Sequence, residues 1–457
     1  MKRGVLLILI LMVLIPVVVV LIYKFEGKKP VVDMVVPSLY LTKSYEMSIE
    51  ITDPKTGLRK IMVSIMQQGK EKILLEKQYD VTGFLGMFGG SKTIKDNLII
   101  PIDFWKYGMT DGEATIQIMV SDYSWRDWGK GNSAYIEKKV IIDSQPPNVN
   151  VLTQRHNIEP GGTAIVIYKL FEENIKSGVK VGDNFFPGHS GLFSDKNIYT
   201  AFFALSHVQG PGTSISVLAE DMAGNTTKRG FHHYIRDKNF PTDTLNISDA
   251  FLEEKIPDFD VGEKNGTFQG EKNPLLKKFL YINGEIRKNN VETILSLSKD
   301  TENKQYWDGK FLRLQGSSKK AGFADQRIYK YAGKVIDRAT HMGIDLASTA
   351  NAHVKAANSG RVIFTQQIGI FGNTVVIDHG FGLCSLYAHL SQISVNKGDM
   401  VKKGDDIGLT GLTGLAGGDH LHFSMIVHNV FVNPVEWWDD SWIKNNITSK
   451  IDFVKQM

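Results

Sequence analysis

Cysteine is almost absent from this sequence, which has a single one, Cys384, among 457 residues. One cysteine cannot form a disulfide within the chain, so packing and hydrogen bonds must stabilise the fold. Because Cys384 lies in a short apolar run, we expect a small buried side chain there rather than a nucleophile. The sequence therefore excludes a disulfide-stabilised scaffold.

An excess of charge of one sign is also missing. Lys and Arg together number 53 and Asp and Glu number 49, which leaves a net charge of +4. Proteins that bind nucleic acid usually concentrate positive charge on one face, so we expect no nucleic-acid partner. The apolar content of 42% is ordinary for a globular protein, and the length suffices for about three domains.

The sequence has one long apolar run, from Val5 to Ile22, and only Pro16 interrupts it. About 18 such residues are enough to span a bilayer. A signal peptide is the competing interpretation, but no small-residue cleavage site follows the run, so we predict an uncleaved single-pass anchor. Lysines flank both ends of the run, and positive charge therefore does not fix the orientation of the anchor.

Most of the remaining chain is predicted to be β-structure. Alternating runs such as residues 114–120 predict antiparallel strands. Asp122, followed by Asn132 and an alternating tail, is echoed by Asp221 followed by Asn225, which predicts two immunoglobulin-like β-sandwich modules in tandem. We expect both modules to be spacers, because no exposed aromatic cluster stands out in either. Binding of a glycan or an envelope protein is the alternative.

Between residues 239 and 320 the pattern becomes helical. Ser248 is an N-cap candidate with glutamates a few residues later, which predicts a short helix. Apolar residues at helical spacing follow from 275 to 298, with breaks expected at Gly284 and at Asn289-Asn290. This helical insert could pack against the back of the next domain or roof its groove.

A histidine pair lies near the C-terminus, in the stretch from 417 to 427, which is predicted to be a strand. Side chains of a strand alternate between its two faces, so His420 and His422 share one face while Leu421 and Phe423 point into a core. The two imidazole rings, two residues apart, therefore point into the same pocket.

A second run, residues 341–346, has the same alternation. It places His341 and Asp345 on one face, and its glycine argues against a helix. Two histidines and one carboxylate are the number and kind of ligands that a catalytic zinc uses, with a fourth position open for water. One histidine of the C-terminal pair can then bind the metal while the other, with His389, handles protons.

The segment from about 322 to 438 resembles the lysostaphin-like zinc endopeptidases, a family that includes the LytM-type cell-wall hydrolases. The resemblance rests on ordered matches at residues 340–348, 354–362, 372–380, 386–391, 395–408, 413–414, 420–423 and 432–434. One departure is the stretch 351–354, where the family usually has a Gly-Thr-Pro-Val-like turn. We interpret this departure as a loop variation away from the metal.

This resemblance implies an antiparallel β catalytic domain with one Zn²⁺. It implies that His341, Asp345 and His422 bind the zinc and that His389 and His420 are the catalytic pair. Every ligand is present, which matters because some relatives have lost ligands and act as non-enzymatic activators of other hydrolases. Which of the two catalytic histidines is the general base stays open.

These implications together predict a membrane-anchored zinc metalloendopeptidase that hydrolyses peptide bonds of peptidoglycan, in cross-links or in stem peptides. The resemblance to cell-wall hydrolases places the N-terminus in the cytoplasm and the bulk of the chain outside the cytoplasmic membrane. One alternative is a non-catalytic or latent envelope regulator that binds and activates a cell-wall hydrolase. Another is a zinc peptidase that acts on envelope proteins.

Other polar residues of this region have simpler interpretations. Arg327 could hold a substrate carboxylate in its planar fork, but a structural ion pair is commoner, and we favour the ion pair. His353, His379 and His428 have no part in the proposed chemistry and are expected to be surface or structural residues.

The patterns taken together predict a mainly β chain of six segments. These are residues 1–29 (cytoplasmic tip, transmembrane anchor and flank), 30–145 and 146–238 (immunoglobulin-like β modules), 239–320 (helical linker or insert), 321–440 (zinc endopeptidase domain) and 441–457 (C-terminal tail).

Overall fold

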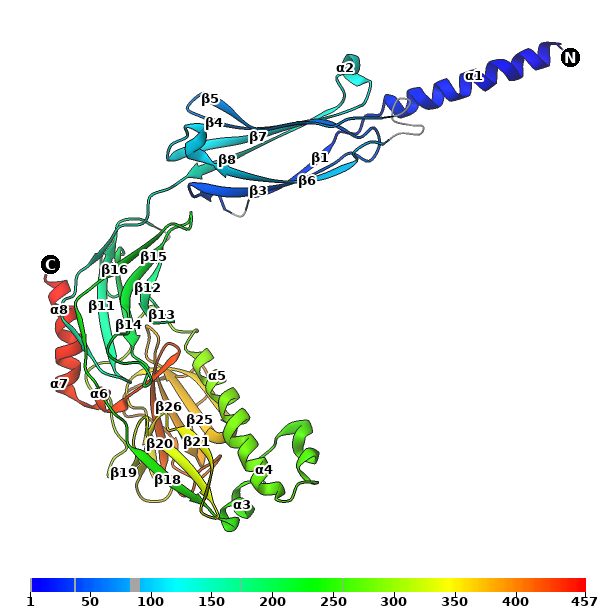
Figure 1. Cartoon of the computed structure of the whole chain (residues 1–457). Coiled ribbons are helices and arrows are strands. Elements are labelled where there is room, and N and C mark those ends of the chain that lie inside the picture. The colour runs from blue at the N-terminus through cyan, green and yellow to red at the C-terminus, as the bar shows by residue number, and fades with distance from the viewer. Residues whose placement is uncertain (1, 37, 83–90, 174, 258) are drawn as a thin grey trace. The chain divides into compact units, whose positions relative to one another are not determined.

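The computed structural model describes residues 2–36, 38–82, 91–173, 175–257 and 259–457 (Figure 1). Strands account for 42% of the structure and helices for 20%, which confirms the prediction of a mainly β protein. The chain forms two compact units. The first comprises residues 1–146 with 220–226, and the second comprises residues 147–219 with 227–457.

Helix α1, Lys2–Lys24, opens the chain. Within the described ranges it is the one helix long and apolar enough to cross a membrane, with a hydropathy of 3.7 over Gly4–Lys24. Its apolar side chains are exposed along its length. A signal sequence has the same length and composition, so the uncleaved anchor stays a prediction.

Two sheets build the first unit around one apolar core. Their strand orders are β1-β3-β6 and β2-β8-β7-β4-β5. In β3, Met47, Ile49 and Ile51 are fully buried while the residues between them are exposed, so one face of the sheet forms the core. The immunoglobulin-like topology stays a prediction. The elements are β1 Val31–Val35, β2 Tyr40–Leu41, β3 Ser44–Thr52, β4 Leu58–Gln67, β5 Lys70–Gln78, β6 Lys95–Asp103, η1 Phe104–Tyr107, β7 Gly112–Asp122, α2 Arg126–Gly129 and β8 Ser133–Ile142.

The Asp and Asn pattern that occurs twice in the sequence forms the same local structure both times. Asp122 accepts hydrogen bonds from the backbone N–H of Asn132 at 2.7 Å and from its side-chain amide at 2.8 Å. Asp221 accepts the same two bonds from Asn225, both at 2.9 Å. Each aspartate therefore fixes an asparagine in a turn at the end of a strand.

The second unit begins with three small sheets, whose strand orders are β14-β11-β9, β13-β12-β15-β16 and β10-β17. One apolar core extends from these strands into the C-terminal part of the chain. The buried Glu436 carboxylate accepts a hydrogen bond from the backbone N–H of Thr163 at 2.8 Å, which ties the two parts together. The elements are β9 Val149–Val151, β10 His156–Ile158, β11 Thr163–Leu170, β12 Lys176–Val181, β13 Asn184–Pro187, β14 Ile198–Ala204, β15 Ile215–Glu220, β16 Thr226–Gly230 and β17 His233–Ile235.

An eight-stranded antiparallel sheet is the centre of the C-terminal part. Its order is β19-β22-β30-β26-β25-β24-β28, with β31 paired to β30. Every residue of β26 and β30 is buried, because both faces of the sheet are covered. The elements are β19 Ser318–Ala321, β22 Ile344–Ala347, β24 Gly360–Ile368, η4 Gly369–Phe371, β25 Gly372–Asp378, β26 Leu383–Leu390, β28 Met400–Val401, β30 Leu421–Val427 and β31 Val430–Val432.

Two smaller sheets flank the large one, with orders β18-β20-β21 and β23-β29-β27. Strand β18 runs parallel to β20 and comes from the segment predicted as a helical insert, so this insert is not helical throughout. Cys384 is buried in the apolar core, as expected, and Trp437 is buried in the same core. The elements are β18 Thr242–Ile247, β20 Gln326–Tyr331, β21 Lys334–Thr340, β23 His353–Lys355, β27 Gln392–Ile393 and β29 Asp406–Leu409.

One group of helices follows β18, and a second group follows β31. The predicted N-cap is confirmed, since the Ser248 side chain accepts from the Phe251 N–H. The predicted break at Asn289-Asn290 is wrong, because the helix continues and Asn290 instead accepts a hydrogen bond from the Ile370 N–H at 2.9 Å. Gly284 lies in a π-helical turn. The elements are α3 Asp249–Lys255, η2 Gly262–Phe268, α4 Pro274–Tyr281, η3 Ile282–Ile286, α5 Arg287–Leu297, α6 Pro434–Trp438, α7 Asp440–Ile443, η5 Lys444–Thr448 and α8 Ser449–Lys455.

Candidate active site

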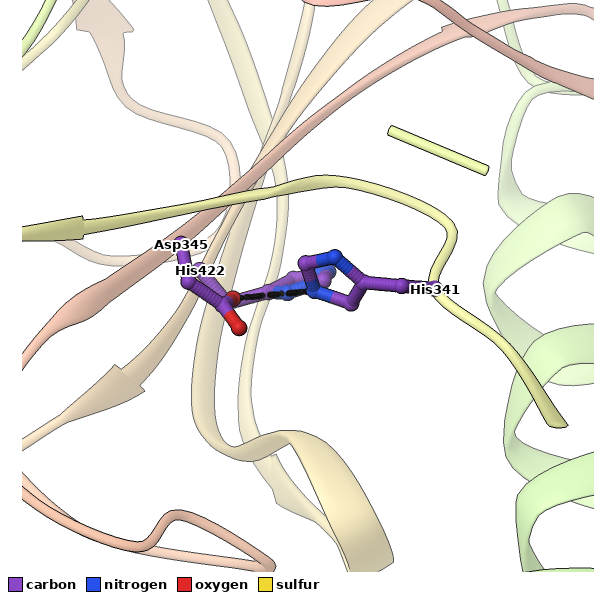
Figure 2. Close-up of side chains that lie close together, drawn as sticks. All are labelled: His341, Asp345 and His422. Atoms are coloured by element: carbon purple, nitrogen blue, oxygen red, sulfur yellow. Dashed lines mark hydrogen bonds and ion pairs between the residues drawn. The ribbon is translucent and has the colours of Figure 1, made fainter. Parts of the chain in front are cut away.

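Three buried side chains, His341, Asp345 and His422, converge at one point of the large sheet (Figure 2). Nε2 of His341 lies 2.9 Å from Oδ1 of Asp345 and 2.9 Å from Nδ1 of His422. Nδ1 of His422 lies 2.9 Å from the same carboxylate oxygen. The structure therefore brings together the three residues that the sequence analysis assigned to the metal.

Neighbouring strands position two of the three. Asp345 in β22 pairs directly with His422 in β30, so their side chains leave the sheet side by side. His341 comes from the connection between β21 and β22, where the chain passes from one sheet to another. The prediction of a strand already starting at His341 is therefore wrong, although the residue still reaches the pocket.

Gly343 is required by this close approach. A Cβ atom at this position would lie 2.5 Å from Oγ of Ser424 and 2.6 Å from Nε2 of His422. No larger residue fits without displacing the His422 ring. The glycine that argued against a helix thus has a packing role beside the site.

Backbone carbonyls fix the tautomers of three histidines. Nδ1 of His341, His389 and His420 lies 2.8 Å from the carbonyl oxygen of Gly322, Thr413 and Gly418 respectively. A carbonyl oxygen can only accept, so Nδ1 carries the proton in each ring when it is neutral. In each neutral ring, Nε2 is then left with its lone pair.

The donor atoms fit a zinc ion. The nitrogen of His341, the oxygen of Asp345 and the nitrogen of His422 form a triangle with sides of 2.9 Å. Ligand atoms of a tetrahedral zinc, with bonds of about 2.1 Å, lie about 3.4 Å apart, so a small outward movement accommodates the ion. Two imidazoles and one carboxylate are also the donors that catalytic zinc sites use.

Charge in the pocket is set by burial and by the carboxylate. Burial raises the pKa of Asp345, but His341 and the neighbouring histidines hold it well below its usual range. Burial lowers the pKa of His422 to about 4 and that of His389 well below its usual value. Burial also lowers the pKa of His420, but Asp345, whose Oδ1 lies 3.5 Å from its Nε2, raises it more. Near neutral pH the pocket therefore holds an ionised carboxylate and neutral rings at His389 and His422.

His389 and His420 face each other beside the candidate metal ligands. Their ring centroids are 4.8 Å apart, and the His389 ring centroid is 5.8 Å from that of His422. His389 has a φ of 63°, in the left-handed region that side chains other than glycine seldom adopt. Such a conformation persists only where the surroundings hold it, and here the hydrogen bond to Thr413 helps to do so.

Arg327 in β20 forms an ion pair with the carboxylate of Asp345. Its Nη2 lies 2.8 Å from Oδ2 of Asp345, and its side chain is 17% exposed. The interpretation of Arg327 as an ion-pair partner is therefore confirmed. No local pattern indicated that this partner would be Asp345.

A cavity of about 310 Å³ is lined by His341, Asp345 and His422. His389 and His420 also line it, and so do residues from the upstream segment: Ile247 of β18, Phe251 of α3, Phe279 of α4 and Arg287 of α5. The predicted insert therefore forms a wall of the pocket. Sequence reasoning missed these residues, because nothing local marks an apolar helix residue as a wall of a distant site.

A comparison with known protein families identifies one family for the region that contains this site. The model of Peptidase family M23 matches residues 339–434. Peptidoglycan DD-endopeptidase ShyB of Vibrio cholerae is 38% identical over 109 residues, which are 24% of this chain and 25% of that protein. DD-carboxypeptidase/endopeptidase Mpg of Neisseria meningitidis is 41% identical over 95 residues, 21% of this chain and 22% of that protein. The chain thus spans about a quarter of the length of these relatives.

Solved structures are also similar to a part of the chain. The catalytic domain of the antimicrobial peptidase lysostaphin from Staphylococcus simulans is 26% identical, with a TM-score of 0.25. The match covers 29% of this chain and 98% of that domain. From the family match, the C-terminal part of this chain, residues 339–434, is a peptidase family M23 domain.

Proposed function

We propose that this chain is a zinc metalloendopeptidase that hydrolyses peptide bonds of peptidoglycan, in cross-links or stem peptides. One observation carries the proposal: His341, Asp345 and His422 meet with their donor atoms 2.9 Å apart, and the rings of His389 and His420 stand beside them. The M23 match and relatives named as peptidoglycan DD-endopeptidases support the substrate class.

His341, Asp345 and His422 would hold the zinc ion. A bound zinc supplies an ionisable water near neutral pH and polarises the scissile carbonyl. Arg327 pairs with the second oxygen of Asp345 and so orients this carboxylate, and Gly322 orients the His341 ring through the carbonyl contact.

His389 and His420 would move the protons. The neutral His389 ring has its Nε2 lone pair free to accept a proton, because Nδ1 donates to Thr413. His420, whose pKa is raised by Asp345, is better suited to carry and return one. His389 is therefore proposed as the base and His420 as the acid that protonates the leaving amine.

The proposed location is the outer side of the cytoplasmic membrane, with α1 as a single-pass anchor. The length and apolar composition of α1 support the anchor. The named activity of the relatives supports a position on the cell-wall side. The two β segments after α1 would act as spacers between the membrane and the catalytic domain.

A latent enzyme is the second candidate, and the pocket wall favours it. Ile247, Phe251 and Phe279 of the upstream segment line the cavity over the ligands. A cross-linked substrate has two peptide stems, and the pocket of about 310 Å³ is small for both. If the enzyme is latent, the upstream segment must move before a cross-linked substrate can bind.

The test is digestion of purified peptidoglycan by the zinc-loaded full chain in detergent micelles, with products identified by mass spectrometry. Release of defined peptides that stops with a chelator and with His389→Ala would support the enzyme. No release from the folded, zinc-loaded protein, even after the pocket wall is opened by substitution, would contradict it and favour a non-catalytic envelope regulator.

A further inference from the structure

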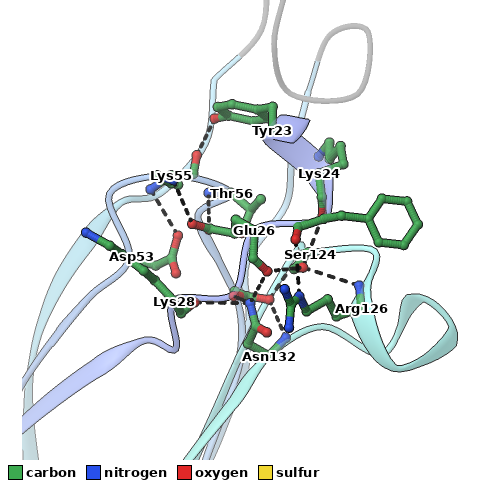
Figure 3. A network of polar contacts seen from close by, with 12 residues as sticks. Tyr23, Lys24, Glu26, Lys28, Asp53, Lys55, Thr56, Ser124, Arg126 and Asn132 are labelled. Atoms are coloured by element: carbon green, nitrogen blue, oxygen red, sulfur yellow. Dashed lines mark hydrogen bonds and ion pairs between the residues drawn. The ribbon is translucent and has the colours of Figure 1, made fainter. Parts of the chain in front are cut away.

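Three carboxylates outside the peptidase domain, those of Glu26, Asp53 and Asp122, meet at one end of the first unit. Figure 3 labels Glu26 and Asp53 of this cluster together with polar residues around them. Glu26 lies between α1 and β1, Asp53 follows the last residue of β3, and Asp122 is the last residue of β7. All three are buried, with exposed fractions of 5%, 1% and 0%. Segments distant in the sequence thus place three acidic groups in one protected spot.

The spacing of these groups suits a single ion. Each residue offers an oxygen atom, and the three oxygens lie within 4.8 Å of one another. Calcium binds oxygen at about 2.4 Å, so ligands on opposite sides of one ion are about 4.8 Å apart. One Ca²⁺ can therefore reach all three carboxylates.

Backbone hydrogen bonds hold the carboxylates in place. Oε1 of Glu26 accepts from the N–H of Thr56 at 3.1 Å, and Oδ1 of Asp53 accepts from the N–H of Gly57 at 2.7 Å. Oδ1 of Asp122 accepts from the N–H of Asn132 at 2.7 Å. These bonds fix the orientation of the acidic groups before any ligand arrives.

One oxygen is left without a hydrogen bond. Oε2 of Glu26 is buried and has no hydrogen-bond partner among the described residues, and the Glu26 side chain is 1% exposed. The Lys55 ammonium forms a long ion pair with it at 3.8 Å, beyond hydrogen-bond distance, and that lysine is half exposed. Lys24 contributes a second positive charge near Asp122. A buried anionic oxygen without a hydrogen bond is costly unless a cation binds it.

The surroundings contain oxygen donors of the kind that calcium prefers. The carbonyl of Lys24 accepts from the Ser124 hydroxyl, and the carbonyl of Glu26 accepts from Ser124 and from the Asn132 amide. The nitrogen donors of the peptidase site have no counterpart in this cluster, since all three of its ligand groups are carboxylates. Carboxylate and carbonyl oxygens favour Ca²⁺ over zinc.

We propose that Glu26, Asp53 and Asp122 form a calcium site that ties the segment after α1 to the first β unit. Glu26 lies in that segment, while Asp53 directly follows β3 of one sheet and Asp122 ends β7 of the other. Binding links all three and restricts the connection that leaves the apolar helix. Calcium sites of extracellular modules bind with dissociation constants of about 10⁻⁴–10⁻³ M, and an affinity in that range is expected.

The first experiment is terbium luminescence on the zinc-loaded full chain in detergent micelles. Trp125 follows Asp122 by three residues and donates its N–H to the Lys24 carbonyl, so it can sensitise a lanthanide at the site. We expect sensitised emission that calcium displaces and that Trp125→Phe removes. Emission that calcium fails to displace, or that survives in Glu26→Gln, would overturn the proposal.

The second experiment measures thermal unfolding in chelator and in calcium. Glu26→Gln removes one of three repelling charges, so we expect a higher Tm than wild type in chelator but a lower Tm in millimolar calcium. Asp96→Asn is the control, because Asp96 pairs with Lys77 in the same unit, and its effect should not depend on calcium. An equal effect of Glu26→Gln in both conditions, or a larger Tm shift with magnesium than with calcium, would overturn the assignment.

Discussion

Arg327 donates from Nη2 to Oδ2 of Asp345 across 2.8 Å, while the other oxygen of that carboxylate faces the two proposed zinc-binding histidines. The carboxylate is thus held from both sides before a metal binds. The histidines hold the pKa of Asp345 well below its usual range, and the contact with Arg327 leaves the other oxygen aimed at the proposed metal position. The ion pair therefore positions the carboxylate of Asp345, although Arg327 contacts none of the histidine nitrogen atoms proposed to bind zinc.

Replacing Arg327 by methionine should weaken zinc binding. The variant leaves one Asp345 oxygen without its partner, and loss of such an outer contact typically costs about 10- to 100-fold in metal affinity. Competition with a chromogenic chelator measures the affinity. Arg338→Met, which removes an exposed arginine on the neighbouring strand β21, is the control and should bind zinc like wild type. Equal affinity in both variants would show that Arg327 does not support the metal.

The ligand and proton-transfer roles can be separated by zinc content. His341→Ala and His422→Ala should lose zinc and peptidoglycan hydrolysis together, because each removes a proposed ligand. His389→Ala should keep zinc and lose about 10²- to 10⁴-fold in rate, the usual contribution of general acid–base catalysis. Elemental analysis and product mass spectrometry give the two readouts.

The control for these variants is His353→Ala, since the His353 side chain is 72% exposed and pairs only with Asp406 among the carboxylates of the described chain. It should retain both zinc and activity. Normal hydrolysis by His389→Ala would contradict the proposed base, and zinc retained in His341→Ala would contradict the ligand set.

Opening the pocket wall should raise activity on cross-linked peptidoglycan. Phe251 lines the cavity and packs on Phe279, with ring centroids 6.4 Å apart. Phe251→Ala weakens this packing, so we expect severalfold faster release from cross-linked material and little change on a short soluble peptide. Phe268→Ala removes a ring of the same size from the same segment but outside the cavity lining, and it is the control. A rate unchanged or lowered on cross-linked material would contradict latency.

Buried histidines should make the protein less stable in acid. His379 is fully buried, and burial lowers its pKa to about 4 from the ordinary value of 6.5. The unfolded chain therefore binds a proton before the folded chain does, so this stabilisation is complete above pH 6.5 and is lost as the pH falls toward 4. The loss amounts to about 3 kcal/mol over that range.

Denaturant unfolding between about pH 4 and 7 checks this prediction. His379→Asn should show a shallower loss of stability in acid than wild type, while exposed His353→Asn should follow the wild-type profile. A His379→Asn profile as steep as that of wild type would contradict the assignment. His428, whose pKa burial lowers to about 3, would then be the group to test in the same way.

Local features of this fold could be predicted because their causes lie within a few residues. The spacing of His420 and His422 by two placed both rings toward one pocket, although β30 itself begins at Leu421. The Ser248 cap and the burial of Cys384 followed from hydrogen bonding and hydrophobicity in the same way. The break predicted at Asn289-Asn290 failed because Asn290 has a distant partner, Ile370.

The sequence by itself determined the donor set, the apolar N-terminal helix and the mainly β composition, since residue type and short-range periodicity are sufficient for these. Only the tertiary structure decided which groups meet. The register of Asp345 opposite His422, the ion pair of Asp345 with Arg327 and the wall formed by Phe251 all join segments far apart in the chain. The same holds for Glu26 and its two aspartate neighbours. Such contacts depend on strand pairing and core packing over long range, which no local pattern records.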